Sequence, residues 1–239
     1  MILRSSASDC HGKHRLLQPS GCTPTKPLFN RRTTLAATLA LLASCTSRID
    51  TPSPQDNKGR VVLLRGLMNI FSTGLNELGN KLTDAGYAAS VHNHTEWYAL
   101  AEELAEQARD QRLLRPLGVA GHSLGGDDAI RLTTALGKAG IPVDLLITFD
   151  PVMTGTVPVG PRQVMNFFQT TGLWGRALRP GPGFDGTIEN IPINSGLLVN
   201  HFNIEKDPML HARVLARLET MHQGVAARTC PLAPRAGLA

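Results

Sequence analysis

Short apolar runs alternate with longer amphipathic stretches from Arg60 to Met221, and this alternation limits the folds open to the chain. The runs suited to strands are 61–64, 87–91, 117–120, 143–149, 164–169 and 188–193, of which the last two are the weaker candidates. The stronger runs are apolar almost without interruption, which is typical of strands buried on both faces. Helices are therefore expected to cover both sides of the sheet.

The stretches between the strand candidates have helical spacing. Helices are predicted over 73–84, 96–110, 127–138 and 208–221. In the first of them, Leu75, Leu78 and Leu82 follow one face at i, i+3 and i+7. Strands that alternate with such helices form βαβ crossovers, which make the strands parallel. The prediction is an α/β fold with a mostly parallel central sheet of about six strands and helices on both faces.

The same pattern sets the expected domain boundaries. The folded domain is predicted to cover 60–222, with a polar, Pro-containing linker over 46–59 before it and a disordered tail over 223–239 after it. The Gly- and Pro-rich segment 171–186 is expected to be a long loop between the last two strands. A domain of this size has no room for a large lid.

The net charge of the chain is concentrated near its beginning. The 239 residues include 24 Lys and Arg and 19 Asp and Glu, which gives a net charge of +5. Residues 1–45 hold six of the basic residues and one acid, so the 18 basic and 18 acidic residues of 46–239 balance. A neutral body gives no reason to expect nucleic acid as a partner.

Residues 1–45 are predicted to be an export leader. Arg31 and Arg32 precede a short apolar segment that ends in small residues, as in a secretory signal, and the pair resembles a twin-arginine signal in part. The segment is about half of the roughly 20 residues that a membrane-spanning helix needs. Leu42-Ala43-Ser44-Cys45 resembles a bacterial lipobox, which implies cleavage before Cys45 and diacylation of its thiol.

The leader leads us to expect a protein of the cell envelope, either periplasmic or held at the membrane only through a lipid anchor at Cys45. The alternative for the apolar segment is a buried helix at the edge of the domain. Residues 1–29 fit neither a signal nor a domain, and we interpret them as disordered or as the product of a start site placed too early.

The most specific motif is Gly121-His122-Ser123-Leu124-Gly125, which follows a strand candidate and precedes a helix candidate. In that setting G-x-S-x-G is a nucleophile elbow. The serine stands on a sharp turn, and the flanking glycines are needed because neighbouring backbone passes too close for a Cβ atom. The serine hydroxyl and the Leu124 amide then face the same space at a helix N-terminus.

With this elbow, residues 60–222 resemble the α/β-hydrolase superfamily, specifically its compact lipase, esterase and thioesterase-like members. The resemblance implies a serine hydrolase whose triad follows the order Ser, acid, His. It also implies a second oxyanion donor in the loop after the first core strand. In this chain that loop begins Gly66-Leu67-Met68, and the Leu67 amide is the expected donor, with Met68 second.

The triad acid is expected to be Asp150. It ends the apolar strand candidate 143–149, so its carboxylate should lie at the same sheet edge as Ser123. A carboxylate there is costly unless it is paired, and a histidine is a suitable partner. Asp185, in the later loop, is the rival candidate, whereas Asp127 and Asp128 are interpreted as helix-start residues.

The expected base is His201, which follows the last strand candidate and precedes the closing helix, where the superfamily carries its histidine. His211 lies inside that helix and is expected to pack. His122 occupies the x position of the elbow, where the residue is usually structural in this motif, and with Met68 and His94 it is also a candidate substrate contact. His92 and His94 end a strand candidate, so turn and cap roles are equally open to them.

These residues predict hydrolysis of a carboxylic ester or thioester through an acyl-enzyme intermediate. The apolar residues Leu67, Met68, Ile70 and Phe71 favour an uncharged, small or lipid-like acyl substrate. Neither a P-loop nor G-x-G-x-x-G follows the first strand candidate, and no ligand set completes a metal site, so we expect no cofactor. An acyltransferase with the same triad and a non-catalytic envelope lipoprotein remain alternatives.

Overall fold

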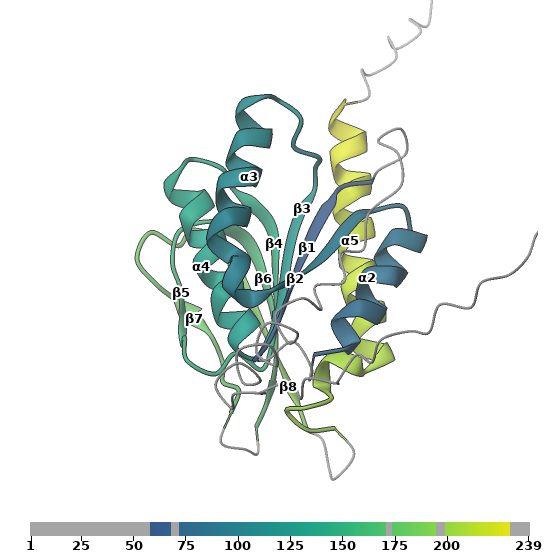
Figure 1. The fold of residues 1–239 in the computed structure, drawn as a ribbon, viewed down its shortest axis with the longest axis vertical. Coiled ribbons are helices and arrows are strands. Elements are labelled where there is room, and N and C mark those ends of the chain that lie inside the picture. The colour runs from purple at the N-terminus through teal and green to yellow at the C-terminus, as the bar shows by residue number, and fades with distance from the viewer. Residues whose placement is uncertain (1–57, 68–71, 171–173, 195–198, 230–239) are drawn as a thin grey trace, which may run out of the picture. The chain divides into compact units, whose positions relative to one another are not determined.

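Six parallel strands form the central sheet, as predicted (Figure 1). The structure is a computed structural model that describes residues 58–67, 72–170, 174–194 and 199–229. The strands, in their order across the sheet, are β2 (Ala88–Asn93), β1 (Arg60–Arg65), β3 (Leu117–His122), β4 (Val143–Phe149), β6 (Pro161–Gln169) and β8 (Thr187–Ile193). The six strand candidates of the sequence correspond to these strands.

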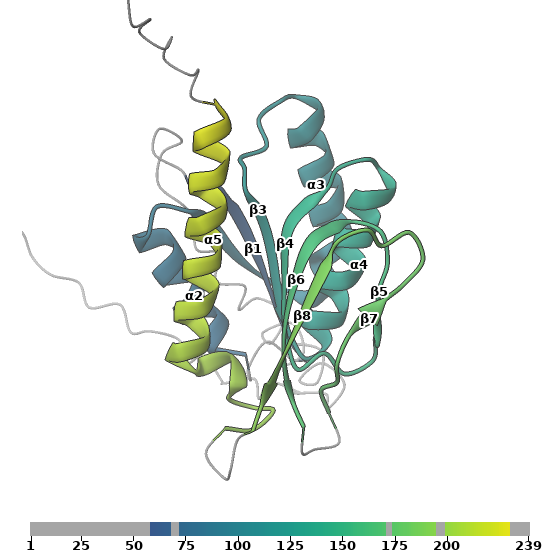
Figure 2. The same ribbon diagram turned by 180° about the vertical axis from the view of Figure 1, so that it is seen from behind.

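Helices cover both faces of the sheet. Figures 1 and 2 show α2 (Gly74–Asp84) and α5 (Pro208–Thr229) on one face, and α3 (Trp97–Arg109) and α4 (Leu124–Lys138) on the other. Along β1, Val61 and Leu63 enter the core under α2 and α5, whereas Val62 and Leu64 enter the core under α3 and α4. Both faces are buried, which is why the strand sequences are apolar without alternation.

The end of the last helix differs from the prediction. Helix α5 continues to Thr229 instead of ending at Met221, so the predicted tail from 223 begins inside the helix. This part of the helix packs on the start of the domain, because Lys58 Nζ lies 2.9 Å from a Glu219 carboxylate oxygen and the His222 ring lies 3.0 Å from the Lys58 carbonyl oxygen. Lys58 and Gly59, placed in the linker by sequence, therefore belong to the domain.

A second difference concerns the long loop predicted over 171–186. It contains β7 (Arg179–Pro180), which pairs with β5 (Thr156–Val157) in a small separate sheet. The buried side chains of Val157 and Leu178 anchor this pair in the core on the α4 side. Two-residue strands carry too little periodicity to be found from sequence.

The strand order places a topological switch point between β1 and β3. The chain passes from β1 to β2 on one side and then returns to β3 on the other. In open parallel sheets, the crevice at the carboxyl ends of the two strands flanking such a point is where ligands bind. The loop after β1 and the G-x-S-x-G turn after β3 meet there.

The predicted leader, Cys45 and most of the predicted linker lie outside the described residues, as does the end of the tail from 230. In the part of the chain that the structure describes, no helix combines the length and apolar character needed to cross a membrane.

The packing of α5 on the sheet gives a first test. Leu218 is fully buried and lies over Gly118 of β3, where an added Cβ would be 3.4 Å from its Cδ2 atom. We expect Leu218→Ala to lower the free energy of unfolding by about 2–5 kcal/mol in a urea titration, because it leaves a cavity in the core. Met209→Ala, at a side chain of the same helix that is 73% exposed, is the control and should change it by less than about 0.5 kcal/mol.

Candidate active site

Ser123 stands on a strained turn between β3 and α4. Its backbone angles are φ 57° and ψ −126°, in a region that residues with a side chain rarely occupy. Its amide donates a 3.0 Å hydrogen bond to the carbonyl oxygen of Phe149, the last residue of β4. The turn is thus tied to the neighbouring strand, which holds the serine at the carboxyl edge of the sheet.

The two glycines of the elbow are required by close backbone contacts. A Cβ atom on Gly121 would collide with the carbonyl group of Gly125, one turn ahead in the chain. A Cβ atom on Gly125 would collide with the carbonyl oxygens of Leu64 and Arg65 at the end of β1. These approaches are the physical reason for the glycines that the sequence shows on either side of His122-Ser123-Leu124.

Ser123, His201 and Asp150 form a continuous hydrogen-bonded series. The distance from Ser123 Oγ to His201 Nε2 is 3.0 Å, and that from His201 Nδ1 to Asp150 Oδ2 is 3.3 Å. The other carboxylate oxygen, Asp150 Oδ1, accepts a 2.7 Å hydrogen bond from the backbone N–H of Gln169. The structure therefore brings together the three residues that sequence reasoning singled out.

Burial supports this arrangement. Asp150 is fully buried, and its φ of 48° is a further strained backbone angle at the end of β4. Trp174 packs edge-on against the His201 ring with centroids 4.5 Å apart, and Phe202 packs edge-on at 5.5 Å. Gly175 passes so close to the Asp150 carboxylate that a Cβ atom there would overlap it. Water is thereby kept from most of the acid–base pair.

The rival candidates lie elsewhere. Asp185 is exposed in the loop before β8, at the amino edge of the sheet, and no hydrogen bond to it is found within the described ranges. His211 is fully buried in α5, where its Nε2 donates to the Glu205 carbonyl oxygen at 2.7 Å. Both observations agree with the choice of Asp150 and His201 over these residues.

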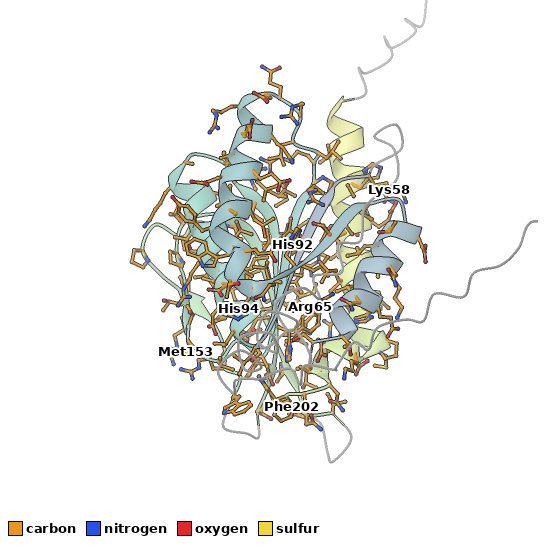
Figure 3. The ribbon with its side chains drawn as sticks, viewed as in Figure 1. Lys58, Arg65, His92, His94, Met153 and Phe202 are labelled. Atoms are coloured by element: carbon orange, nitrogen blue, oxygen red, sulfur yellow. The ribbon has the colours of Figure 1, made fainter. Side chains whose placement is uncertain are left out.

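An apolar cavity of about 510 Å³ opens beside Ser123. Its lining residues are Leu67, Ser72, His122, Ser123, Leu124, Val152, Met153, Trp174, His201 and Phe202. Figure 3 shows Met153 and Phe202 at the same end of the domain, opposite Lys58. Leu67 and Leu124, the candidate oxyanion residues, both line this cavity, whereas Met68 lies outside the described residues.

His94 does not have the position expected of a substrate contact. It is absent from the cavity lining, and its Nδ1 lies 2.6 Å from an Asp128 carboxylate oxygen (Figure 3 labels His94). Arg131 contacts the other oxygen of that carboxylate at 2.6 Å. The prediction of a substrate contact at His94 is therefore corrected: the residue links the segment just before α3 to α4. Its neighbour His92 bonds Ser90 and Glu96, so a turn role fits both histidines.

His122 borders the cavity but has no free ring nitrogen for a substrate. Its Nδ1 is 2.8 Å from Ser72 Oγ, and its Nε2 is 2.7 Å from the carbonyl oxygen of His201. Burial, and next the charge of His201, lower the pKa of His122 to about 4. Both ring nitrogens of His122 are therefore used in bonds within the protein, and neither is open for the substrate contact that the sequence suggested.

Sequence reasoning missed several residues that shape the site. Asp127, interpreted as a helix-start residue, accepts hydrogen bonds from the backbone N–H groups of Val152, Met153 and Thr154 at 2.7–3.2 Å. It thereby fixes the loop after β4, which lines the cavity. Trp174 was missed as well. The only sequence signal was its place near the end of β6, at the carboxyl edge of the sheet.

Glu205 is a buried acid behind the site. Its carboxylate is fully buried, and neither of its oxygens has a hydrogen-bond partner within the described part of the chain. One of them lies 3.9 Å from His122 Nε2. Burial raises the pKa of Glu205 to about 7. The folded protein therefore binds a proton here that the unfolded chain releases above about pH 4.5.

This proton makes stability fall as the pH rises from about 4.5 to about 7. We expect Glu205→Gln to remove that loss, so that the variant gains stability over the wild type across this range, by an amount on the order of 3 kcal/mol. Denaturant titrations at several pH values measure the difference. Glu102→Gln makes the same chemical change at an exposed position of α3 and is the control. A pH-independent difference for Glu205→Gln would contradict the assignment.

Comparison with known proteins gives one family match. Residues 80–159 match the thioesterase domain family, a range that includes the elbow and Asp150 but not His201. No curated protein sequence matches the chain.

Several solved structures are similar to this chain at low sequence identity. An esterase from Thermogutta terrifontis is 12% identical, with a TM-score of 0.48, over 79% of this chain and 89% of that chain. The esterase domain of a Rhodothermus marinus protein is 14% identical, with a TM-score of 0.46, over 72% and 91%. The RedJ thioesterase from Streptomyces coelicolor is 14% identical, with a TM-score of 0.42, over 81% and 97%.

The sheet order, the elbow at the switch point and the thioesterase-domain match over residues 80–159 are consistent with one another. A serine held in this way after the central strand of a parallel sheet is the feature that the lipases, esterases and thioesterases of this fold share. The chain therefore has an α/β fold of the α/β-hydrolase kind, and over residues 80–159 it is similar to the thioesterase domain family, which supports a hydrolase of the lipase, esterase and thioesterase type.

Proposed function

We propose that the protein cleaves a carboxylic ester or thioester through an acyl-enzyme intermediate on Ser123. The observation that carries the proposal is the hydrogen-bonded series from Ser123 Oγ through the His201 ring to the Asp150 carboxylate, with distances of 3.0 and 3.3 Å. A serine hydroxyl is a weak nucleophile unless a base removes its proton, and these contacts supply that base.

In the first half of the reaction, Ser123 Oγ attacks the carbonyl carbon of the substrate while its proton passes to His201 Nε2. The resulting tetrahedral intermediate collapses, and the alcohol or thiol leaves with the proton that His201 returns. In the second half, water attacks the acyl group on Ser123, again giving its proton to His201. The acid product leaves, and the proton returns to Ser123 Oγ.

Asp150 orients the base. Its carboxylate faces His201 Nδ1, which favours the tautomer with a proton on Nδ1 and leaves Nε2 free to accept from Ser123. The backbone N–H of Gln169 holds the second carboxylate oxygen, so the acid cannot turn away from the ring. Because Asp150 is fully buried, its attraction to the imidazolium that forms is stronger than it would be in water.

The amides of Leu124 and Leu67 are the proposed oxyanion donors. The Leu124 amide is the first of helix α4, where N–H groups have no acceptor within the helix and the dipole favours negative charge. Leu67 follows Gly66 in the loop after β1, and its side chain lines the same cavity. Preorganised donors of this kind stabilise the tetrahedral intermediate.

The cavity supports an uncharged, partly apolar acyl substrate. Leu67, Val152, Met153, Trp174 and Phe202 form most of its wall. Its polar lining comes from Ser72, His122, Ser123 and His201, and no Asp, Glu, Lys or Arg is among the described lining residues. A charged acyl group would therefore lose its hydration without gaining a partner.

The short distance from Ser123 Oγ to His201 Nε2 speaks against a non-catalytic binding role, which would require no such contact. We expect Ser123→Ala to lower turnover of p-nitrophenyl esters and acyl thioesters by at least about 10⁴-fold. The same change should abolish labelling by a fluorophosphonate probe. Labelling that survives in Ser123→Ala would rule out Ser123 as the nucleophile.

We also propose that the chain is exported and anchored through Cys45. The support is the basic, apolar and small-residue order of the leader and the lipobox-like Leu42-Ala43-Ser44-Cys45. In a bacterial host fed radiolabelled palmitate, the wild type is expected to carry the label in the membrane fraction. Cys45→Ala should carry none, whereas Cys230→Ala, at a cysteine in the tail, should keep it. Label in Cys45→Ala would contradict the anchor.

A further inference from the structure

His122 and Ser72 form a buried hydrogen-bonded bridge beside the proposed nucleophile. His122 is 2% exposed and Ser72 is 1% exposed. Ser72 Oγ accepts a 2.9 Å hydrogen bond from the backbone N–H of Gly66 and lies 2.8 Å from His122 Nδ1. His122 Nε2 lies 2.7 Å from the carbonyl oxygen of His201.

The direction of each bond follows from the chemistry of its ends. The His201 carbonyl oxygen can only accept, so His122 Nε2 carries the proton. In a neutral imidazole Nδ1 is then bare and accepts from the Ser72 hydroxyl. The hydroxyl oxygen in turn accepts from the Gly66 amide. The series runs one way, from Gly66 N–H through Ser72 O–H to His122, and from His122 N–H to His201.

The surroundings of the ring keep it neutral. The His201 ring lies 5.1 Å from it between centroids, and a positive charge on His122 would be repelled when His201 is charged. Lys206 acts in the same direction, and within the described residues Glu205 is the acidic group that forms a contact within 4.0 Å of the ring, 3.9 Å from Nε2. Burial is the largest influence and lowers the pKa of His122, against the opposing effect of the hydrogen bond to the His201 carbonyl oxygen, so the ring is neutral near pH 7 and the bridge keeps one orientation.

The bridge joins three segments that the chain does not connect directly. Gly66 precedes the candidate oxyanion residue Leu67, His122 precedes the nucleophile Ser123, and His201 is the proposed base. Gly66 also packs on the elbow itself, since a Cβ atom there would lie 2.9 Å from the His122 carbonyl oxygen. Errors of about 1 Å in such an arrangement can lower a rate by about 10²-fold.

We propose that His122 is a positioning residue that acts through two hydrogen bonds. Its bond with Ser72 fixes the position of Gly66, and thereby of the proposed oxyanion amide of Leu67. Its Nε2–H bond fixes the position of the His201 backbone. This inference rests on the proposed function, because it assigns a role to His122 within that reaction. It replaces the substrate contact that the sequence suggested for this residue.

Each of these two hydrogen bonds of His122 can be removed by a different substitution. Ser72→Ala and His122→Gln both remove the Ser72–His122 bond, whereas the Gln amide N–H can still reach the His201 carbonyl oxygen. His122→Asn keeps an acceptor near Ser72 and loses the bond to His201. The matched control is Ser90→Ala, since Ser90 and His92 form a buried Ser–His bond of 2.7 Å on β2 outside the site. Circular dichroism and melting curves check that each variant is folded.

With a p-nitrophenyl ester, Ser72→Ala and His122→Gln are each expected to lower kcat roughly 10–100-fold, with KM changed less than about threefold. The double variant should be no worse than either single variant, because both changes remove the same bond. His122→Asn should also lower kcat, since it loses the bond from the ring to the His201 carbonyl oxygen. Ser90→Ala should leave kcat within about twofold of the wild type.

Hydrogen exchange at the Gly66 amide gives a readout that does not need activity. Its protection should fall at least about tenfold in Ser72→Ala, where the acceptor of that amide is lost, and stay unchanged in Ser90→Ala. Three outcomes would each overturn the inference. They are unchanged protection of the Gly66 amide in Ser72→Ala, a near-normal kcat in Ser72→Ala, His122→Gln and His122→Asn alike, and fully additive losses of kcat in the double variant. If the wild type hydrolyses no ester faster than Ser123→Ala does, the proposed function is wrong. Hydrogen exchange at the Gly66 amide then remains as the test of whether the Ser72–His122 bridge holds Gly66.

Discussion

The strained backbone of Ser123 is the constraint on which the site depends. A residue at φ 57° and ψ −126° costs about 1–3 kcal/mol, and it persists only where its surroundings hold it. Here the carbonyl groups at the end of β1 lie so close to Gly125 that no side chain would fit there. The Phe149 carbonyl oxygen at the end of β4 accepts a hydrogen bond from the Ser123 amide. Because both neighbouring strands fix the turn, the hydroxyl stands at the switch point of the sheet, where the other site residues can reach it.

The parallel sheet explains how residues far apart in sequence meet at this serine. Each strand runs the same way, so the ends of β1, β3, β4 and β8 deliver their loops to one edge. Asp150 directly follows β4, the strand next to β3 and the elbow. His201 lies after β8, the last strand, and contacts with neighbouring side chains hold it at the site. Trp174 and Phe202 cover its ring, and His122 holds its carbonyl oxygen. The site therefore consists of loops joined mainly by side chains.

Local patterns were enough to predict the strands, the elbow and Asp150, because apolar runs, required glycines and strand ends leave clear sequence signals. His201 was expected from its place before the closing helix and from the resemblance to the superfamily. Contacts between distant segments leave no such signals. Lys58, which the sequence placed in the linker, bonds Glu219 of α5, 161 positions later. His94 pairs with Asp128, 34 positions away, and His122 with Ser72, 50 positions away, so their roles could not be derived from spacing. The same holds for Asp127, which orders the loop after β4.

The acyl-enzyme on Ser123 is the central claim, and mass spectrometry of acid-quenched enzyme during turnover of a p-nitrophenyl ester tests it most directly. With Ser123 as the nucleophile, the mass of one acyl group is expected on the peptide that contains Ser123, lost again as the substrate is consumed, with an early burst of p-nitrophenol where deacylation is the slower step. Steady turnover with the acyl group on another residue, or with no acylated peptide at any time, would contradict it.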